Sequence, residues 1–352
     1  MQVITKANEG SKLDTLAQVG TAKEKKENKK KPIIIMGKGS DLSDNEALFR
    51  KGKKKLITQK IVLSLSDVAK RKGNKKLEKL FWNTFYCQNF VTSAEGRLYS
   101  NYCKNKVCSV CAGIRKAKKI KELLPIVKSW DQPYFVTLTA RSVYANKLGI
   151  RMKKMNIGLR KILDKYKKKA QRGKSIKFEG FKTLECNFNS KKRTYNPHLH
   201  LIVKNKEMAE IIIREWLILC TTKFALPDGQ KAIPVRDVEE SLIEVIKYST
   251  KQFTDPDPNN KKGKASQFVY TSAMFNILSA MEGLRTFEKF GFMISKSNRN
   301  ESNYKIVNET EEWEYNAEVL DWLNSKHQRL TGYSATSELL KMLTNNINSD
   351  LE

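Results

Sequence analysis

The sequence predicts a mixed α+β fold, for three reasons. Segments rich in branched and aromatic residues have the character of strands, at 133–140, 178–188 and 196–203. Other segments repeat apolar residues at helical spacing, chiefly 56–86, 152–166, 207–222, 237–251 and 266–290. Turn-forming residues 189–192 separate the last two strand segments, so we expect those two strands to form a hairpin.

The chain is strongly basic. It has 352 residues, a formal net charge of +30 and an isoelectric point of about 9.8. Such an excess of positive charge favours a polyanionic partner, with DNA or RNA ahead of an anionic membrane surface. No apolar run is long enough to span a membrane, and the N-terminus lacks the apolar core of a secretory signal. We therefore expect a soluble, cytoplasmic protein.

Composition divides the chain into four parts. Residues 1–55 are dominated by Lys, Asn, Gly and Ser and predict a basic flexible arm. Its lysine block at 23–31 is either a solvated tail or a DNA-contacting arm. Residues 56–130 predict a helical, cysteine-containing DNA-binding region, and 131–295 the main domain. Residues 296–352 turn more acidic and predict a mostly helical extension.

Four of the six cysteines gather before the main domain: Cys87, Cys103, Cys108 and Cys111. The last two form a C-x-x-C knuckle, and four thiolates satisfy tetrahedral zinc. In a cytoplasmic protein a structural Zn²⁺ site is favoured over free thiols or a redox pair. Cys87 is the most distant of the four in sequence and the least certain ligand.

A basic segment follows the knuckle and predicts a helix that ends near Pro125. Four of its residues are candidates for contacts with DNA phosphates: Arg115, Lys116, Lys118 and Lys119. The alternative is a solvated helix face.

Two of the chain's three histidines, His198 and His200, lie one residue apart on the third strand. Alternate side chains of a strand share a face, so the two imidazoles point the same way. Neutral imidazole is a common metal ligand, and the pair predicts a metal clamp. The alternative is two polar residues on a half-exposed strand. Glu185, on the preceding strand, is either a third ligand that leaves an open position or a cross-strand partner of a lysine.

The helix expected at 237–251 begins with Asp237 as its cap and buries one apolar side. Glu244, Tyr248 and Lys251 fall together on another side, at helical spacing. A row of ordinary surface residues is the alternative. Beside a bound metal ion, however, these types suit phosphodiester chemistry. Tyrosine attacks phosphorus, lysine neutralises the reacting centre, and the carboxylate activates water.

Three motifs in this order carry a family resemblance. They are Phe135-Val-Thr-Leu-Thr139, His198-Leu-His200 and Glu244-x-x-Lys247-Tyr248-x-x-Lys251. Together with the cysteine run and Arg115, they resemble the rolling-circle plasmid replication initiators (Rep) of the HUH endonuclease superfamily. The single tyrosine in the third motif matches the plasmid type. The resemblance spans about residues 85 to 295 and leaves out the basic arm and the acidic C-terminal region.

The resemblance implies an antiparallel sheet flanked by helices, similar to an RNA-recognition-like palm, with 131–295 as the nickase domain. It implies that Tyr248 nicks one DNA strand at the plasmid origin through a 5′-phosphotyrosine, leaves a 3′-OH primer and rejoins the ends at termination. His198 and His200 would bind Mg²⁺ or Mn²⁺, Lys251 would assist, and Glu244 would activate water. Partners would be origin DNA, single-stranded or in a hairpin, with host helicase and polymerase as further candidates.

Two other functions compete with this interpretation. One is a mobilisation relaxase or transposase of the same superfamily, which has the same chemistry on another DNA site. The other is a non-catalytic, zinc-containing nucleic-acid-binding regulator. A regulator accounts for the charge and the cysteines but gives no purpose to the paired histidines or to the Glu/Tyr/Lys side of the helix.

Overall fold

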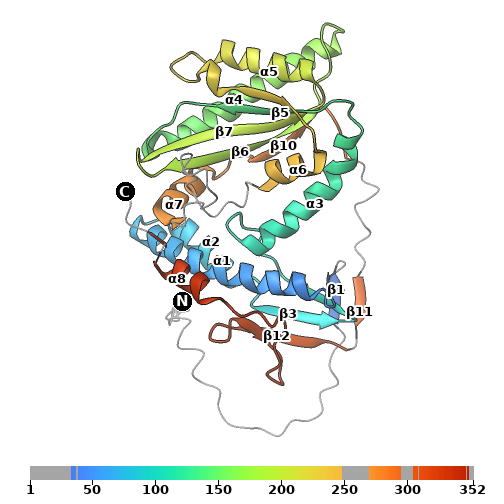
Figure 1. Ribbon diagram of the computed structural model, residues 1–352, viewed down its shortest axis with the longest axis vertical. Coiled ribbons are helices and arrows are strands. Elements are labelled where there is room, and N and C mark those ends of the chain that lie inside the picture. Colours follow the sequence, from blue (N-terminus) through green and yellow to red (C-terminus); the bar gives the residue numbers. More distant parts are fainter. Residues whose placement is uncertain are drawn as a thin grey trace, which may run out of the picture.

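The computed structural model describes residues 33–36, 39–247, 269–294, 304–307, 309–345 and 347–348. Within them the α+β prediction is confirmed (Figure 1). One five-stranded sheet lies in the upper half of the molecule, and a second one lies below the long helix α1. Helices flank both sheets. Among the described residues, no helix is both long and apolar enough to cross a membrane.

The upper sheet is antiparallel, with strand order β10-β6-β7-β5-β8. The predicted hairpin is present as the two long central strands β6 and β7. The strand bounds are β5 (Tyr134–Thr139), β6 (Gly180–Asn189), β7 (Thr194–Val203), β8 (Lys231–Pro234) and β10 (Phe287–Phe290). A short 3-10 turn, Pro227–Gly229, precedes β8.

Helices cover both faces of the upper sheet. On one face, α4 (Ala145–Gln171) and α5 (Lys206–Leu219) pack on a core that contains Leu199 and Leu201. On the other, α3 (Ser109–Lys128) and α6 (Val238–Lys247) pack around Ile202. Helix α3 continues through Pro125, where the sequence predicted its end, because Leu123 and Val127 on either side are buried in this second core.

The helical segment expected at 56–86 is two helices, α1 (Asn45–Arg71) and α2 (Lys75–Phe85). They are separated by Gly73, whose φ of +65° ends the first helix. Helix α1 also starts earlier than expected, because the Asp44 side chain accepts a 2.8 Å hydrogen bond from the Ala47 amide and caps it. Residues 45–55, which the sequence assigned to the basic arm, are therefore helical, and residues 1–32 and 37–38 of that arm lie outside the described part.

The C-terminal part contains more strand than the mostly helical extension that the sequence favoured. Trp313 and Tyr315 alternate with exposed residues and are buried on one face of β12, the period of a half-buried strand. The lower sheet has the order β13-β12-β3-β4-β2. Its strands are β2 (Ser40–Asp41), β3 (Phe90–Ala94), β4 (Arg97–Ser100), β12 (Glu311–Asn316) and β13 (Asp321–Leu323).

The remaining elements are one helix and two small sheets. Helix α8 (Ser337–Asn345) packs near α1. An antiparallel pair joins β1 (Ile33–Met36) to β11 (Tyr304–Val307), and a parallel pair joins β9 (Val269–Tyr270) to β14 (Ile347–Asn348).

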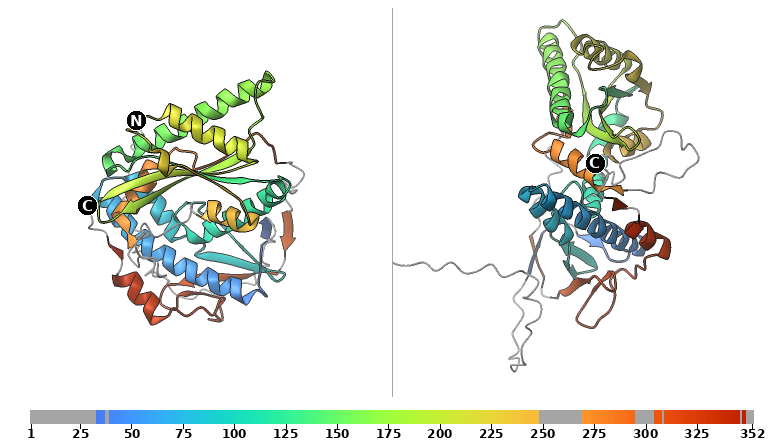
Figure 2. Two further views of the ribbon diagram at one scale, coloured as in Figure 1. Left: turned by 45° about the horizontal axis from the view of Figure 1, so that its top comes forward. Right: turned by 90° about the vertical axis from the view of Figure 1, so that its left-hand side faces the viewer.

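Helix α7 (Thr271–Ala280) lies between the upper and lower halves (Figure 2). Ala273 and Ile277 belong to the core under α4, whereas Met274 and Phe275 belong to the core around α1. The helix expected over 266–290 is thus shorter. Gly283, with a φ of +68°, lies in the turn that leads the chain into β10.

Trp322 ties the C-terminal strands to the rest of the lower half. Its side chain is fully buried, and its Nε1 donates a 2.6 Å hydrogen bond to the Gln88 carbonyl.

We expect Trp322→Ala to lower the free energy of unfolding by about 3–5 kcal/mol, because it leaves a large cavity. Urea denaturation measures this. The control Phe90→Ala, at a side chain 69% exposed in the same sheet, should change it by less than about 1 kcal/mol. Equal losses for the two variants would contradict the prediction.

Candidate functional site

The upper sheet brings Glu185, His198 and His200 together. Glu185 on β6 lies directly opposite His198 on β7. His198 Nε2 is 3.3 Å from one carboxylate oxygen of Glu185, and His200 Nδ1 is 3.2 Å from the other. All three offer a ligand atom within 4.8 Å of one another. The predicted shared face of the two imidazoles and the proximity of Glu185 are therefore both present.

Neighbouring groups fix the orientation of this trio. His198 Nδ1 lies 3.0 Å from the Asn196 carbonyl, an arrangement that leaves Nε2 toward Glu185. The Phe135 ring packs beside the His200 ring, with 5.0 Å between centroids. Burial alone raises the pKa of Glu185, but the close contacts with His198 and His200 outweigh burial and hold that pKa below its usual value. The carboxylate is thus held in its charged, ligating form.

The trio fits a divalent metal ion. Two imidazole nitrogens and one buried carboxylate form a donor set on one side of an ion and leave positions for water or phosphate oxygen. Nitrogen donors suit Mn²⁺ better than Mg²⁺, which prefers oxygen ligands. The alternative role of Glu185 is pairing with a lysine. In the described part of the chain, both of its ion-pair contacts are with histidines.

Helix α6 lies on the same face of the sheet as the trio. Its Asp237 cap is confirmed, since the side chain accepts a 2.8 Å hydrogen bond from the Glu240 amide. Leu242, Val245 and Ile246 are buried against the core that contains Ile202 of β7. Glu244 is half-buried on this helix. Tyr248 and Lys251 lie outside the described residues.

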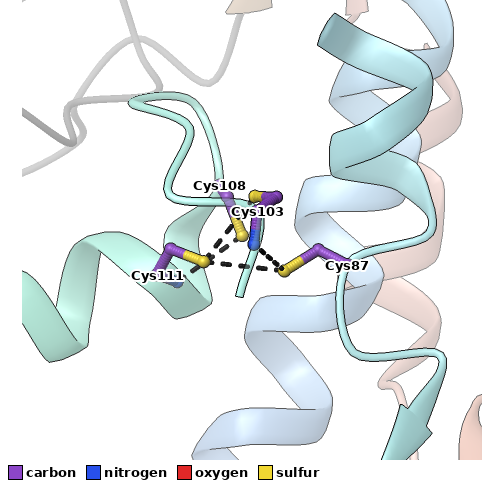
Figure 3. Close-up of side chains that lie close together, drawn as sticks. All are labelled: Cys87, Cys103, Cys108 and Cys111. Carbon is purple, nitrogen blue, oxygen red and sulfur yellow. Dashed lines mark hydrogen bonds between the residues drawn. The ribbon is translucent and has the colours of Figure 1, made fainter. Parts of the chain in front are cut away.

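The four cysteines form a second cluster, in the lower half (Figure 3). Cys87 comes from the turn after α2 and Cys103 from the loop after β4, while Cys108 and Cys111 belong to the start of α3. Their sulfur atoms point toward one another. Cys111 Sγ is 3.5 Å from that of Cys87 and 3.6 Å from that of Cys103. Cys87, the least certain member on sequence grounds, thus lies within the cluster.

The cysteine cluster fits zinc. Four sulfur ligands about 2.3 Å from a tetrahedral ion lie about 3.8 Å from one another, close to the separations found here. Hydrogen bonding with Cys108 holds the pKa of the Cys103 thiol well below its usual value, and the same contact raises the pKa of Cys108. Metal binding would replace this sharing of protons with four thiolate bonds.

Lys55 supports the cysteine cluster, a role that no sequence pattern indicated. The side chain is 1% exposed. Its Nζ donates hydrogen bonds to the carbonyls of Phe85 and Cys87 and to Asn89 Oδ1, at 2.8, 2.7 and 2.6 Å. Burial lowers the pKa of Lys55 to about 8, and the nearby cysteines oppose this shift. Lys55 therefore holds the turn that carries Cys87, and it supplies positive charge beside a cluster that becomes anionic when it binds zinc.

The basic residues of α3 differ in their surroundings. Lys118 is exposed, and Lys116 is half-buried. Arg115 donates a 2.8 Å hydrogen bond to the Asn105 carbonyl and so braces the knuckle loop. Lys119 Nζ lies 3.5 Å from the centroid of the Phe287 ring, and burial lowers the pKa of Lys119 to about 8. Among the four predicted DNA contacts, Arg115 and Lys119 therefore also have a structural role within the protein.

Comparison with known proteins identifies relatives of this chain. A family model described as "Replication protein" matches residues 97–211. The Staphylococcus aureus "Protein rep" is 32% identical over 190 residues, 48% of this chain and 79% of that protein. A Bacillus sp "Protein rep" is 31% identical over 137 residues, 37% of this chain and 43% of that protein. One from Bacillus amyloliquefaciens is 31% identical over 116 residues, 31% of this chain and 33% of that protein. No solved structure matches.

Metal analysis of the purified protein tests whether the cysteine cluster binds zinc. We expect about one zinc per chain, lost in Cys108→Ser because three thiolates hold zinc far more weakly than four. The control Cys220→Ser removes a buried thiol outside the cluster and should keep its zinc. Elemental analysis by mass spectrometry gives the ratio. Zinc retained in Cys108→Ser, or lost equally in both variants, would argue against the assignment.

Proposed function

This chain belongs to the Rep family of plasmid replication initiators, and on that premise we propose that it starts rolling-circle replication as a metal-dependent, site-specific DNA nickase. The substrate is one strand of the plasmid origin, presented single-stranded or in a hairpin. The nicked 5′ end stays on Tyr248, and the free 3′-OH primes synthesis. At termination the same centre rejoins the ends.

One observation carries this proposal. The Glu185–His198–His200 trio and the described part of α6 lie on the same face of one sheet. Tyr248 follows Lys247, the last described residue of α6, directly in the sequence. A metal site and a tyrosine on adjoining elements supply the two groups that a phosphotyrosine mechanism requires.

The proposed reaction is a transesterification. The phenolic oxygen of Tyr248 attacks the scissile phosphorus, a new Tyr–O–P bond forms, and the bond from phosphorus to the 3′ oxygen breaks. The phenolic proton passes to solvent, and the departing 3′ oxygen takes up a proton from solvent to become a hydroxyl. A bound divalent ion would polarise the scissile phosphate. Lys251 neutralises charge on the phosphoryl oxygens, and Glu244 accepts a proton from the water that later releases the strand.

Two observations favour replication initiation over the rival functions. The relatives carry the name of replication proteins, which favours initiation over a relaxase or transposase role. A non-catalytic regulator gives no reason for a buried carboxylate between two imidazoles. Such a carboxylate costs free energy to bury unless it is paired or ligates an ion.

Replacing the nucleophile tests the role of Tyr248. We expect Tyr248→Phe to abolish the covalent protein–DNA product on a denaturing gel and to bind an origin oligonucleotide within about twofold of wild type, since only one hydroxyl is lost. Tyr86→Phe, at a side chain 56% exposed in the lower half, is the control and should nick normally. Nicking of supercoiled origin DNA by Tyr248→Phe would refute the assignment.

The three histidines provide a matched test of the metal site. His198→Ala combined with His200→Ala should reduce the nicking rate by at least about a hundredfold, as a chelator does. The control is His327→Asn, which replaces the exposed third histidine. The backbone φ of this residue is 58°, a value that asparagine tolerates. This variant should nick as wild type does. Mn²⁺ should support nicking at a lower concentration than Mg²⁺ because two ligands are nitrogen. Undiminished nicking by the double variant would exclude these residues as ligands.

A further inference from the structure

A groove runs along α4 on the side of the sheet away from the histidines. It consists of two adjoining cavities, of about 580 and about 520 Å³, between α4 and β10 with the residues that follow it. Both cavities are lined by Asn156, Arg160 and Glu288, so they form one continuous depression. Figure 1 shows α4 and α6 on opposite sides of the upper sheet.

The lining of the groove is basic. Its cationic residues are Lys153, Arg160, Lys167, Lys177, Lys182 and Arg285. The acidic ones are Asp164 and Glu288. Glu288 is shared by Lys182, at 3.9 Å, and Arg285, at 3.6 Å. Across the described ranges, Lys153, Arg160 and Lys167 form no ion pair, and all three are exposed. Three exposed cations without an ion-pair partner in the described part of the chain therefore lie along one side of the groove.

The floor of the groove is apolar, and at one point two backbone segments lie very close together. Leu159 and Phe178 are buried there, and Phe290 and Phe292 line the cavity beside them. Gly291 has a φ of +79°, and a Cβ on it would lie 1.8 Å from the Phe178 carbonyl oxygen. Only glycine fits at this point, so the wall formed by residues 290–293 is held tightly against the start of β6.

A buried cation lies at the bottom of the groove. Lys182 is 3% exposed, and its Nζ donates hydrogen bonds to Asn156 Oδ1 and, at 2.9 Å, to the Arg285 carbonyl. Burial lowers the pKa of Lys182 to about 8, and Glu288 opposes the shift. This amine therefore joins α4 to the turn before β10.

We propose that this groove is a second DNA-binding site, which holds a single-stranded segment on the face of the sheet opposite the nicking centre. The cations along α4 contact backbone phosphates, and the phenylalanine-lined floor takes unpaired bases. Duplex DNA keeps its bases within the stack and cannot offer them to a narrow apolar floor. The site does not depend on nicking, and it would keep one strand engaged while the other face of the sheet processes DNA.

Neighbouring residues of α4 allow a matched test. Arg160→Gln with Lys167→Gln removes two groove cations. Lys161→Gln with Lys168→Gln removes two exposed cations, each one position further along the same helix and outside the groove lining. The full-length variants are titrated against a labelled oligothymidine that lacks origin sequence, by fluorescence anisotropy at several salt concentrations. Circular dichroism checks that each variant is folded.

We expect the groove variant to lose about tenfold in affinity, with the slope of log K against log salt reduced by about 1.4, the value for two lost single-strand phosphate contacts. The control variant should stay within about twofold of wild type. Equal losses in both variants would assign the effect to net charge and overturn the proposal, as would wild-type binding by the groove variant. A loss of the same size for duplex DNA would overturn the single-strand assignment.

A second variant tests binding in the groove independently, in case the double variant misfolds. Met293 lines the groove and is 92% exposed, so Met293→Asp adds a negative charge there without touching the core. Ile218→Asp, at a side chain 72% exposed on α5, is its control. We expect only Met293→Asp to weaken oligothymidine binding. Unchanged oligothymidine binding with loss of poly-glutamate binding would assign the groove to an acidic peptide and overturn the proposal.

Discussion

The register of the β6–β7 hairpin is the constraint on which the candidate site depends. Glu185 is paired with His198, and Thr183 with His200, so all four side chains share one face. Leu199 and Leu201 occupy the other face, within the core under α4. A slip of one residue would move the imidazoles into that core and the leucines out of it. Burying the leucines therefore also specifies where the metal ligands lie.

This part of the site was predictable from the sequence, because strand alternation acts over neighbouring residues. The apolar residues of 196–203 predict the strand, and the period of two then places His198 and His200 together. The C-terminal strands were not predicted. Trp313 and Tyr315 alternate correctly, but acidic residues surround them, and β12 pairs with β3, more than two hundred residues earlier in the chain. A local pattern gives no information about a partner so distant.

Net charge predicts the class of partner but not the roles of individual residues. Three lysines, Lys55, Lys119 and Lys182, each have a pKa lowered to about 8 by burial and contact groups within the protein. In the sequence they are indistinguishable from lysines that face solvent, since each lies in or near a basic run. What separates the two kinds is the partner: a carbonyl, a ring or an amide fixed by the fold. The cations that remain exposed are those best suited to contact phosphates.

Helix α3 connects the cysteine cluster to the sheet. Its first residues follow Cys108, whose sulfur accepts a hydrogen bond from the Cys111 amide at the helix start. Its far end places Leu123 and Val127 in the same core as Leu242 and Val245 of α6. Because the backbone hydrogen bonds of a helix are continuous, the helix is stiff and fixes the position of one end relative to the other. Order at the cysteines therefore supports the packing of α6, the helix that leads to Tyr248. An ion bound by the cysteines in the lower half would thus contribute to the geometry of the candidate site in the upper half.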